Sequence, residues 1–278
     1  MTAVVEFMDN YSAIKTITFD AANHTIGGID DETNTVDSHE VNFLTGGTYD
    51  LTLNVASGAS LTTYAAFNGG SGGEQLIKSG AGSQSILGLI SGFGASGTPG
   101  VVVQGGSLKL ANASNSFDGD ILISGGTLEI GSNSGASGTG NFQMTGGQIS
   151  SDGSTARNYS SKTLSISGTV EIGDTTNSGA LTFGDTTISA ATTLTVSSAV
   201  NIGAISGNFG FTKTGSGTLT VDSMTGSGGT TISGGTLIAL STGSSPNING
   251  TFERTGTTTI NNGGTLQIRG AMMGAVVP

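Results

Sequence analysis

Short stretches of alternating apolar and polar residues recur along the chain, and several of them meet at a pair of glycines. The clearest copies span residues 101–110 and 121–130, with glycine pairs that begin at residues 105 and 125. A third pair begins at residue 146, so the pattern repeats about every 20 residues. Strict alternation puts the apolar side chains on one side of an extended strand. We therefore expect short strands joined by tight glycine corners.

Such strands are expected to stack. One coil of about 20 residues buries almost no apolar surface by itself, whereas stacked coils pair every strand with the coil above and below and enclose a continuous apolar column. No stretch shows the apolar spacing of a long amphipathic helix. The pattern thus predicts an all-β solenoid, an elongated rod of parallel strands.

The repeat is defined by its glycine pairs and by the apolar residue two positions after each pair. These residues are Gly105, Gly106, Leu108, Gly125, Gly126, Leu128, Gly146, Gly147, Ile149, Gly234, Gly235, Leu237, Gly263, Gly264 and Leu266. The apolar residues are expected to point into the column. In the last copy Ile260 stands three residues before the pair instead of two, which would reverse its facing. A bulge or a longer corner is expected there.

Composition narrows the class of protein. The 278 residues include 49 glycines, which favours a flexible linker, but 35% are hydrophobic and they keep the alternating phase, which favours a folded β-rich chain. There is no cysteine, so disulfide and thiol chemistry are excluded. The formal net charge is −11 and the eight Lys and Arg residues are scattered. This charge pattern disfavours nucleic acid and anionic membranes as partners.

Candidate metal and catalytic residues are few. Asp30, Asp31 and Glu32 form the densest acidic group and offer oxygen ligands of the kind that Ca²⁺ uses, although a solvated acidic loop explains them better. His24 and His39 are interpreted as polar side chains at strand ends, since no Gly-x-Ser-x-Gly elbow accompanies them. No cofactor is expected.

A polysaccharide-cleaving enzyme remains an alternative at this point. Two carboxyl groups about 5–9 Å apart could do acid/base work, and neighbouring coils could supply Asp118 or Asp120 beside Glu129 or Asp152.

The aromatic side chains divide into two expected groups. Tyr11, Tyr49, Tyr64 and Tyr159 could offer flat contacts to a glycan. Most phenylalanines are expected to fill the column, for example Phe43, Phe142, Phe183 and Phe209.

One segment carries a family resemblance. Residues 205–240 contain Lys213-x-Gly215-x-Gly217-x-Leu219, followed after about a dozen residues by the pair at 234. This segment resembles the passenger-associated repeats of bacterial autotransporters, and a more diverged copy starts at Lys78. The resemblance implies a right-handed parallel β-helix outside the outer membrane of a Gram-negative bacterium, anchored by a C-terminal translocator that this chain does not contain.

The resemblance also sets the expected organisation and function. We expect one passenger fragment over residues 1–278, with N-terminal coils or a cap at 1–58, repeats at 59–149, diverged coils at 150–204 and repeats at 205–278. The expected function is non-catalytic: adhesion to a host or neighbouring-cell protein or glycan, or self-association. The alternatives are a structural stalk that presents another functional region and, third, a polysaccharide-degrading enzyme.

Overall fold

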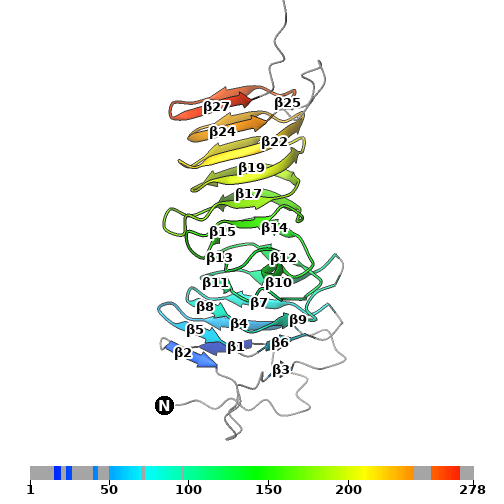
Figure 1. Ribbon diagram of the computed structural model, residues 1–278, viewed down its shortest axis with the longest axis vertical. Helices are drawn as coiled ribbons and strands as arrows, with labels where there is room; N and C mark the ends of the chain where they lie inside the picture. Colours follow the sequence, from blue (N-terminus) through cyan, green and yellow to red (C-terminus); the bar gives the residue numbers. More distant parts are fainter. Residues whose placement is uncertain are drawn as a thin grey trace, which may run out of the picture.

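The chain winds into a β-solenoid, which Figure 1 shows as short strands stacked along one long axis. The computed structural model describes residues 16–19, 23–26, 40–42, 50–64, 66–69, 73–95, 97–240 and 252–269, with only the backbone described for the first three stretches. Within these residues every pairing between named strands is parallel. The all-β, solenoidal and elongated fold predicted from the alternation is confirmed.

Strand register sorts the strands into three faces. Face 1 holds β1 (Thr16–Phe19), β4 (Leu51–Val55), β7 (Leu76–Ser79), β10 (Pro99–Val103), β12 (Asp120–Ile123), β14 (Phe142–Met144) and β25 (Phe252–Arg254). Face 2 holds β2 (Asn23–Ile26), β5 (Ser60–Thr63), β8 (Ser83–Ile86), β11 (Ser107–Leu110), β13 (Thr127–Ile130), β15 (Gln148–Ser151), β21 (Phe211–Thr214), β23 (Thr230–Ile232) and β26 (Thr258–Ile260).

Face 3 begins as a separate three-stranded sheet and continues higher in the rod. It holds β3 (Glu40–Asn42), β6 (Ala66–Asn68) and β9 (Ile90–Ser91), then β16 (Arg157–Tyr159), β18 (Leu181–Phe183), β24 (Gly235–Leu240) and β27 (Gly264–Arg269). A short 3-10 turn, η1 (Ser134–Ser137), lies between these two parts in the sequence. Among the described residues no helix is long and apolar enough to cross a bilayer.

Four longer strands turn a corner and serve two faces each. β17 (Leu164–Ile172) and β19 (Thr186–Val196) begin on face 1 and end on face 2. β20 (Val200–Ser206) and β22 (Thr218–Gly226) begin on face 3 and end on face 1. In the stretch without a glycine pair, these four strands themselves bend from one face to the next and so continue the solenoid.

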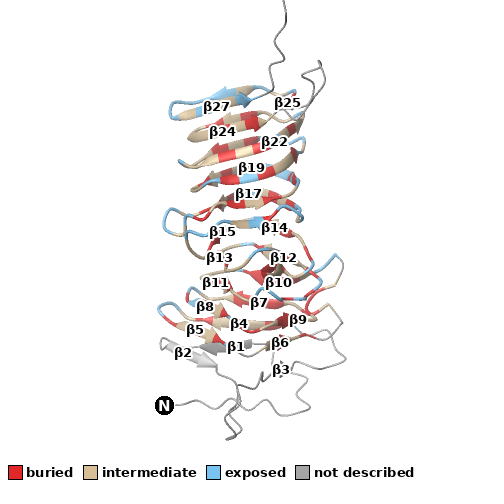
Figure 2. Cartoon of the chain, in the orientation of Figure 1, coloured by how far each residue is buried: buried red, intermediate tan, exposed pale blue. Residues whose placement is uncertain are grey.

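The core is a column of inward side chains inside the three faces. The strands that contribute to it carry the segments coloured red, for buried residues, in Figure 2. Leu108, Leu128 and Ile149 stack in register on β11, β13 and β15, and each is 0% exposed. Their neighbours in sequence alternate between buried and half-buried positions. The predicted inward direction of these apolar residues is therefore confirmed.

The aromatic predictions hold only in part. Phe142 and Phe183 lie in the column as expected, and the ring of Tyr159 packs edge-on against Phe142 with ring centroids 5.3 Å apart. Tyr159 is therefore fully buried, and its prediction as a glycan contact is wrong. It occupies the inward position of β16, where its hydroxyl donates to the carbonyl of Ser132.

The prediction for Phe209 is also wrong: it is 47% exposed, because it sits in a turn between β20 and β21. Tyr64 is 58% exposed; Tyr11, Tyr49 and Phe43 lie outside the described residues.

The irregular last copy keeps its register by lengthening a corner. Ile260 pairs with Ile232 and Gly264 pairs with Gly235, so three steps of chain in one coil match four in the next. The extra residue is taken up in a turn in which the amide of Gly264 donates to the carbonyl of Asn261 at 3.0 Å. The longer corner expected from the sequence is confirmed.

The inward position of Leu128 gives a test of the column. Replacement Leu128→Asp buries a carboxylate without a partner, and we expect the free energy of unfolding to fall by several kcal/mol. Glu129→Ala on the same strand changes an outward side chain and should alter stability by less than about 1 kcal/mol. Chemical unfolding followed by circular dichroism measures both; equal effects would contradict the assignment of inside and outside.

Candidate functional site

The glycine motifs occupy two different edges of the rod. The pairs that begin at Gly105, Gly125 and Gly146 turn the chain from face 1 to face 2. Gly215 and Gly217, and the pairs that begin at Gly234 and Gly263, turn it from face 2 to face 3. The apolar residue after each corner is buried at Leu219 and Leu237, and half-buried at Leu266. The motif thus changes edge between the two parts of the chain.

In the pair Gly125 and Gly126 the stacking requires both glycines. A Cβ atom on Gly125 would lie 2.5 Å from the carbonyl oxygen of Gln104 in the coil below. Gly126 has a φ of +67°, a conformation that other residues rarely adopt, and its Cβ would lie 2.6 Å from the carbonyl oxygen of Gly106. Close coil approach and the left-handed turn together explain why the sequence shows two glycines at this place.

We therefore expect Gly126→Ala to destabilise the rod by about 2 kcal/mol or more, from backbone strain and the clash with the coil below. Gly153→Ala is the matched control, because a Cβ there meets nothing within 4 Å and its φ lies outside the left-handed region. Thermal unfolding of the two variants and the wild type makes the comparison. If the Gly126→Ala protein were as stable as the Gly153→Ala protein, the corner would accommodate a Cβ atom and the expected clash would be contradicted.

The lysine of the motif points into the column. Lys213 pairs with the buried Leu194 of the coil before it and with Ile232 of the coil after it, and it is 0% exposed. Its ammonium donates to the carbonyls of Thr214, Gly215 and Gly234 at 3.3, 3.4 and 2.9 Å. Burial lowers its pKa from 10.5 to about 8, so it remains largely protonated at neutral pH.

Lys78 repeats this arrangement at the other edge of the rod. It is 1% exposed, and its ammonium donates to the carbonyls of Ser79, Gly80 and Gly105 at 2.7, 3.0 and 3.0 Å. Burial lowers its pKa to about 8 as well. Sequence reasoning recognised the motif but missed this role. The signal was present, since Lys213 follows the inward Phe211 by two residues and so shares its phase.

The two lysines predict a dependence of stability on pH. Their pKa values are about 8 in the folded protein and about 10.5 in the unfolded chain, so the unfolded chain binds more protons between these values. The free energy of unfolding should therefore rise as the pH increases from about 8 towards 10. Above that range burial of Tyr159, which raises its pKa, acts in the opposite direction. A Tm series over this window should rise less in Lys213→Met, and a flat or falling wild-type curve would contradict the assignment.

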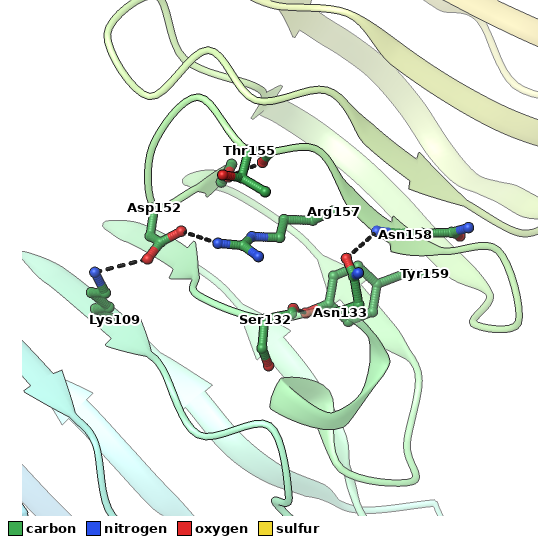
Figure 3. Close-up of polar contacts among 9 residues, drawn as sticks. Lys109, Ser132, Asn133, Asp152, Thr155, Arg157, Asn158 and Tyr159 are labelled. Carbon is green, nitrogen blue, oxygen red and sulfur yellow. Dashed lines mark hydrogen bonds and ion pairs between the residues drawn. The ribbon is translucent and has the colours of Figure 1, made fainter.

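A charged cluster lies on the outside near the middle of the rod (Figure 3). Asp152 accepts from Lys109 Nζ at 2.8 Å and from Arg157 at 2.6 Å. Burial raises the pKa of Asp152, but the two cations outweigh it and hold that pKa below its usual value. Glu129 lies between these coils, and burial raises its pKa. The cluster links neighbouring coils through paired charges.

The carboxylates considered for hydrolysis fall on different faces. Asp120 is the first residue of β12 on face 1 and Asp118 precedes that strand by two residues. Both line a hollow together with Thr139 and Asn141. Asp120 accepts from the amide of Asn141 at 2.8 Å, and Asp118 accepts from the hydroxyl of Thr139 at 3.1 Å.

Glu129 lies on face 2 and Asp152 follows it one coil later. The described contacts of Asp118 and Asp120 therefore do not include the second pair of carboxylates.

The residues weighed as metal ligands or bases lie mostly outside the described part of the chain. This holds for Asp30, Asp31, Glu32 and His39, while only the backbone of His24 is described, in β2. Among the residues that the structure does describe, no three His, Asp or Glu side chains gather closely enough to hold a metal ion.

Outward threonines form a row in the upper part of face 2. They stand in register on consecutive strands at Thr169, Thr193, Thr212, Thr231 and Thr259. All five are half-buried or exposed. Beside them the hydroxyls of Thr195 and Thr214 lie 2.9 Å apart. The row presents neutral hydroxyl groups at the spacing of parallel strands.

Comparison with models of known protein families identifies the repeated segments that contain the glycine corners. The model of the passenger-associated-transport-repeat matches residues 104–130, 211–239 and 248–268. The chain carries passenger-associated-transport repeats. The second match covers the Lys213 corner, and the first begins at the pair of glycines that Lys78 reaches. These repeats and the β-solenoid fold together support an autotransporter passenger domain. No curated protein and no solved structure matches the chain.

Proposed function

We propose that this chain is a non-catalytic contact surface of an autotransporter passenger, which adheres to a host or neighbouring cell or associates with its own kind. The outward threonine row of face 2 carries the proposal, since it repeats one type of polar group over five consecutive coils. Parallel stacking spaces such groups about 4.8 Å apart. Individually weak contacts then sum over an interface of about 1,200–2,000 Å².

The contacts of the Lys and Arg side chains favour a surface protein or a neutral glycan as the partner. Of the seven Lys and Arg side chains that the structure describes, Lys78, Lys162, Lys213 and Arg254 donate to backbone carbonyls, Lys109 and Arg157 pair with Asp152, and Arg269 donates to Gln267. A polyanion needs exposed cations that are not already committed in this way. The partner we propose is therefore neither nucleic acid nor an anionic lipid surface.

The location follows from the repeat. Passenger-associated-transport repeats support export, and we propose that the rod stands outside the outer membrane of a Gram-negative cell, held there by a C-terminal translocator. A parallel solenoid suits display because each coil contacts only its neighbours, so length can be added without a new core.

A structural stalk is the second candidate, and the polar contacts between coils favour it. Asn115 accepts from the amide of Ile90 at 2.9 Å and donates to the carbonyl of Ala136 at 3.0 Å, so one buried side chain ties three coils. Such bonds stiffen a rod without offering anything to a partner. The polysaccharide-degrading alternative has less support, since Asp118 and Asp120 lie on another face than Glu129.

The adhesin and the stalk differ in what the isolated chain binds. We expect the purified protein to bind whole cells, matrix proteins or glycans on an array, or to clump cells that display it. The triple variant Thr193→Val, Thr212→Val and Thr231→Val keeps side-chain shape and strand preference but removes hydroxyls, and should weaken that binding by about tenfold or more.

The matched control replaces three threonines of face 3, Thr182, Thr220 and Thr236, which are half-buried like those of the row. Its binding should stay within about twofold of wild type. Binding that both triple variants weaken equally would remove face 2 as the contact surface. Neither binding nor clumping by the wild-type protein would favour the stalk.

A further inference from the structure

Three corners of the rod share a cation at the same sequence position. Lys78, Lys213 and Arg254 each stand two residues before a glycine, at Gly80, Gly215 and Gly256. These three are also the only buried cations among the described residues, with exposed fractions of 1%, 0% and 6%. The sequence position and the burial therefore coincide in every described case.

The two lysines connect their own coil to the next one. Each ammonium donates to two carbonyls of its own corner and to one carbonyl of the glycine pair a coil later, Gly105 for Lys78 and Gly234 for Lys213. A protonated amine has three donors, and three carbonyls receive them. The hydrogen bonds described for the two ammonium groups all go to carbonyls and none goes to a carboxylate.

Arg254 connects in the opposite direction. Its guanidinium donates to the carbonyl of Gly228 at 3.1 Å in the preceding coil, and to those of Gly207 at 3.2 Å and Phe209 at 2.5 Å in the coil before that. One side chain thus spans two coil boundaries. Arginine can do this because its planar fork carries five donors.

The arrangement follows the motif and not one edge of the rod. Lys78 and Arg254 serve the edge between faces 1 and 2, whereas Lys213 serves the edge between faces 2 and 3. A buried cation that donates to corner carbonyls therefore occurs at two different edges of the rod, so the contact is not a property of one edge.

We infer that each of these three buried cations is a clamp that couples neighbouring coils, so that it decides how cooperatively the rod opens around its own corner. In a solenoid, stability is a sum of terms within each repeat and terms between neighbours. Hydrogen bonds from a charged donor are about twice as strong as neutral ones. One such bond from each lysine, and those of Arg254, cross the boundary between coils. The glycines allow the coils to approach, and the cation holds them together. This role is independent of the proposed contact function.

Native-state hydrogen exchange of the full chain tests the clamp. In Lys213→Met the side chain keeps its shape but leaves three corner carbonyls without a donor, and we expect the amides of Ser233 and Thr236 to exchange at least about tenfold faster. Amides of β12 and β13 should keep wild-type rates. Lys109→Met is the control, because that lysine is partly exposed and pairs with Asp152 on the outside; it should leave Ser233 and Thr236 unchanged.

Two more variants separate a clamp from general destabilisation. Lys213→Arg should restore most of the protection, since an arginine performs this role at position 254, and Arg254→Met should expose the coils at 205–232 while sparing those at 99–130. Unchanged exchange at Ser233 and Thr236 in Lys213→Met would overturn the inference. So would faster exchange spread evenly over all coils. If Lys213→Met does not fold, exchange rates at residues 205–232 in Arg254→Met test the inference in the same way.

Discussion

The whole molecule depends on one constraint: the backbone of every coil must donate and accept hydrogen bonds to the coils on either side of it. The amide of Ser124 donates to the carbonyl of Val103, and the amide of Thr145 donates to the carbonyl of Ile123, each at 2.9 Å. Because this pairing is parallel and in register, whatever stands at one position lies about 4.8 Å from its counterpart in the next coil. A residue type that stacks well is therefore repeated, as the column of Leu108 and Leu128 shows.

The same constraint explains where the few cations lie. At a corner the chain turns out of its sheet, and carbonyls of neighbouring coils converge at the turn. An ammonium or guanidinium satisfies several of them at once, as Lys213 and Arg254 do. Cations used in this way are withdrawn from the surface, as the burial of Lys78, Lys213 and Arg254 shows.

The sequence predicts what repeats and fails where the repeat is interrupted. Alternation around the glycine pairs was sufficient to assign Leu128 and Ile149 to the interior, since a strand has only two sides. Tyr159 and Phe209 could not be placed this way, because one follows the loop at residues 152–156, which lacks the alternation, and the other sits inside a turn. The change of edge between Gly146 and Gly215 was hidden for the same reason, as β17 and β19 turn corners without a glycine pair.

For a related reason the sequence could not predict whether the candidate catalytic carboxylates lie close together. Whether Asp120 lies near Glu129 depends on the number of corners between them in the chain. The alternation of apolar and polar residues gives the inside and outside of a strand but not the position of the corners.

The lengthened corner before Gly264 shows how the rod accommodates a change in chain length. One added residue was absorbed at an edge, and the strands on both sides still pair with the coil below. Sheet geometry and edge length are thus decoupled in this architecture. The edges can diversify by insertion and deletion while the faces stay aligned, so a scaffold of this kind can vary its outline without rebuilding its interior.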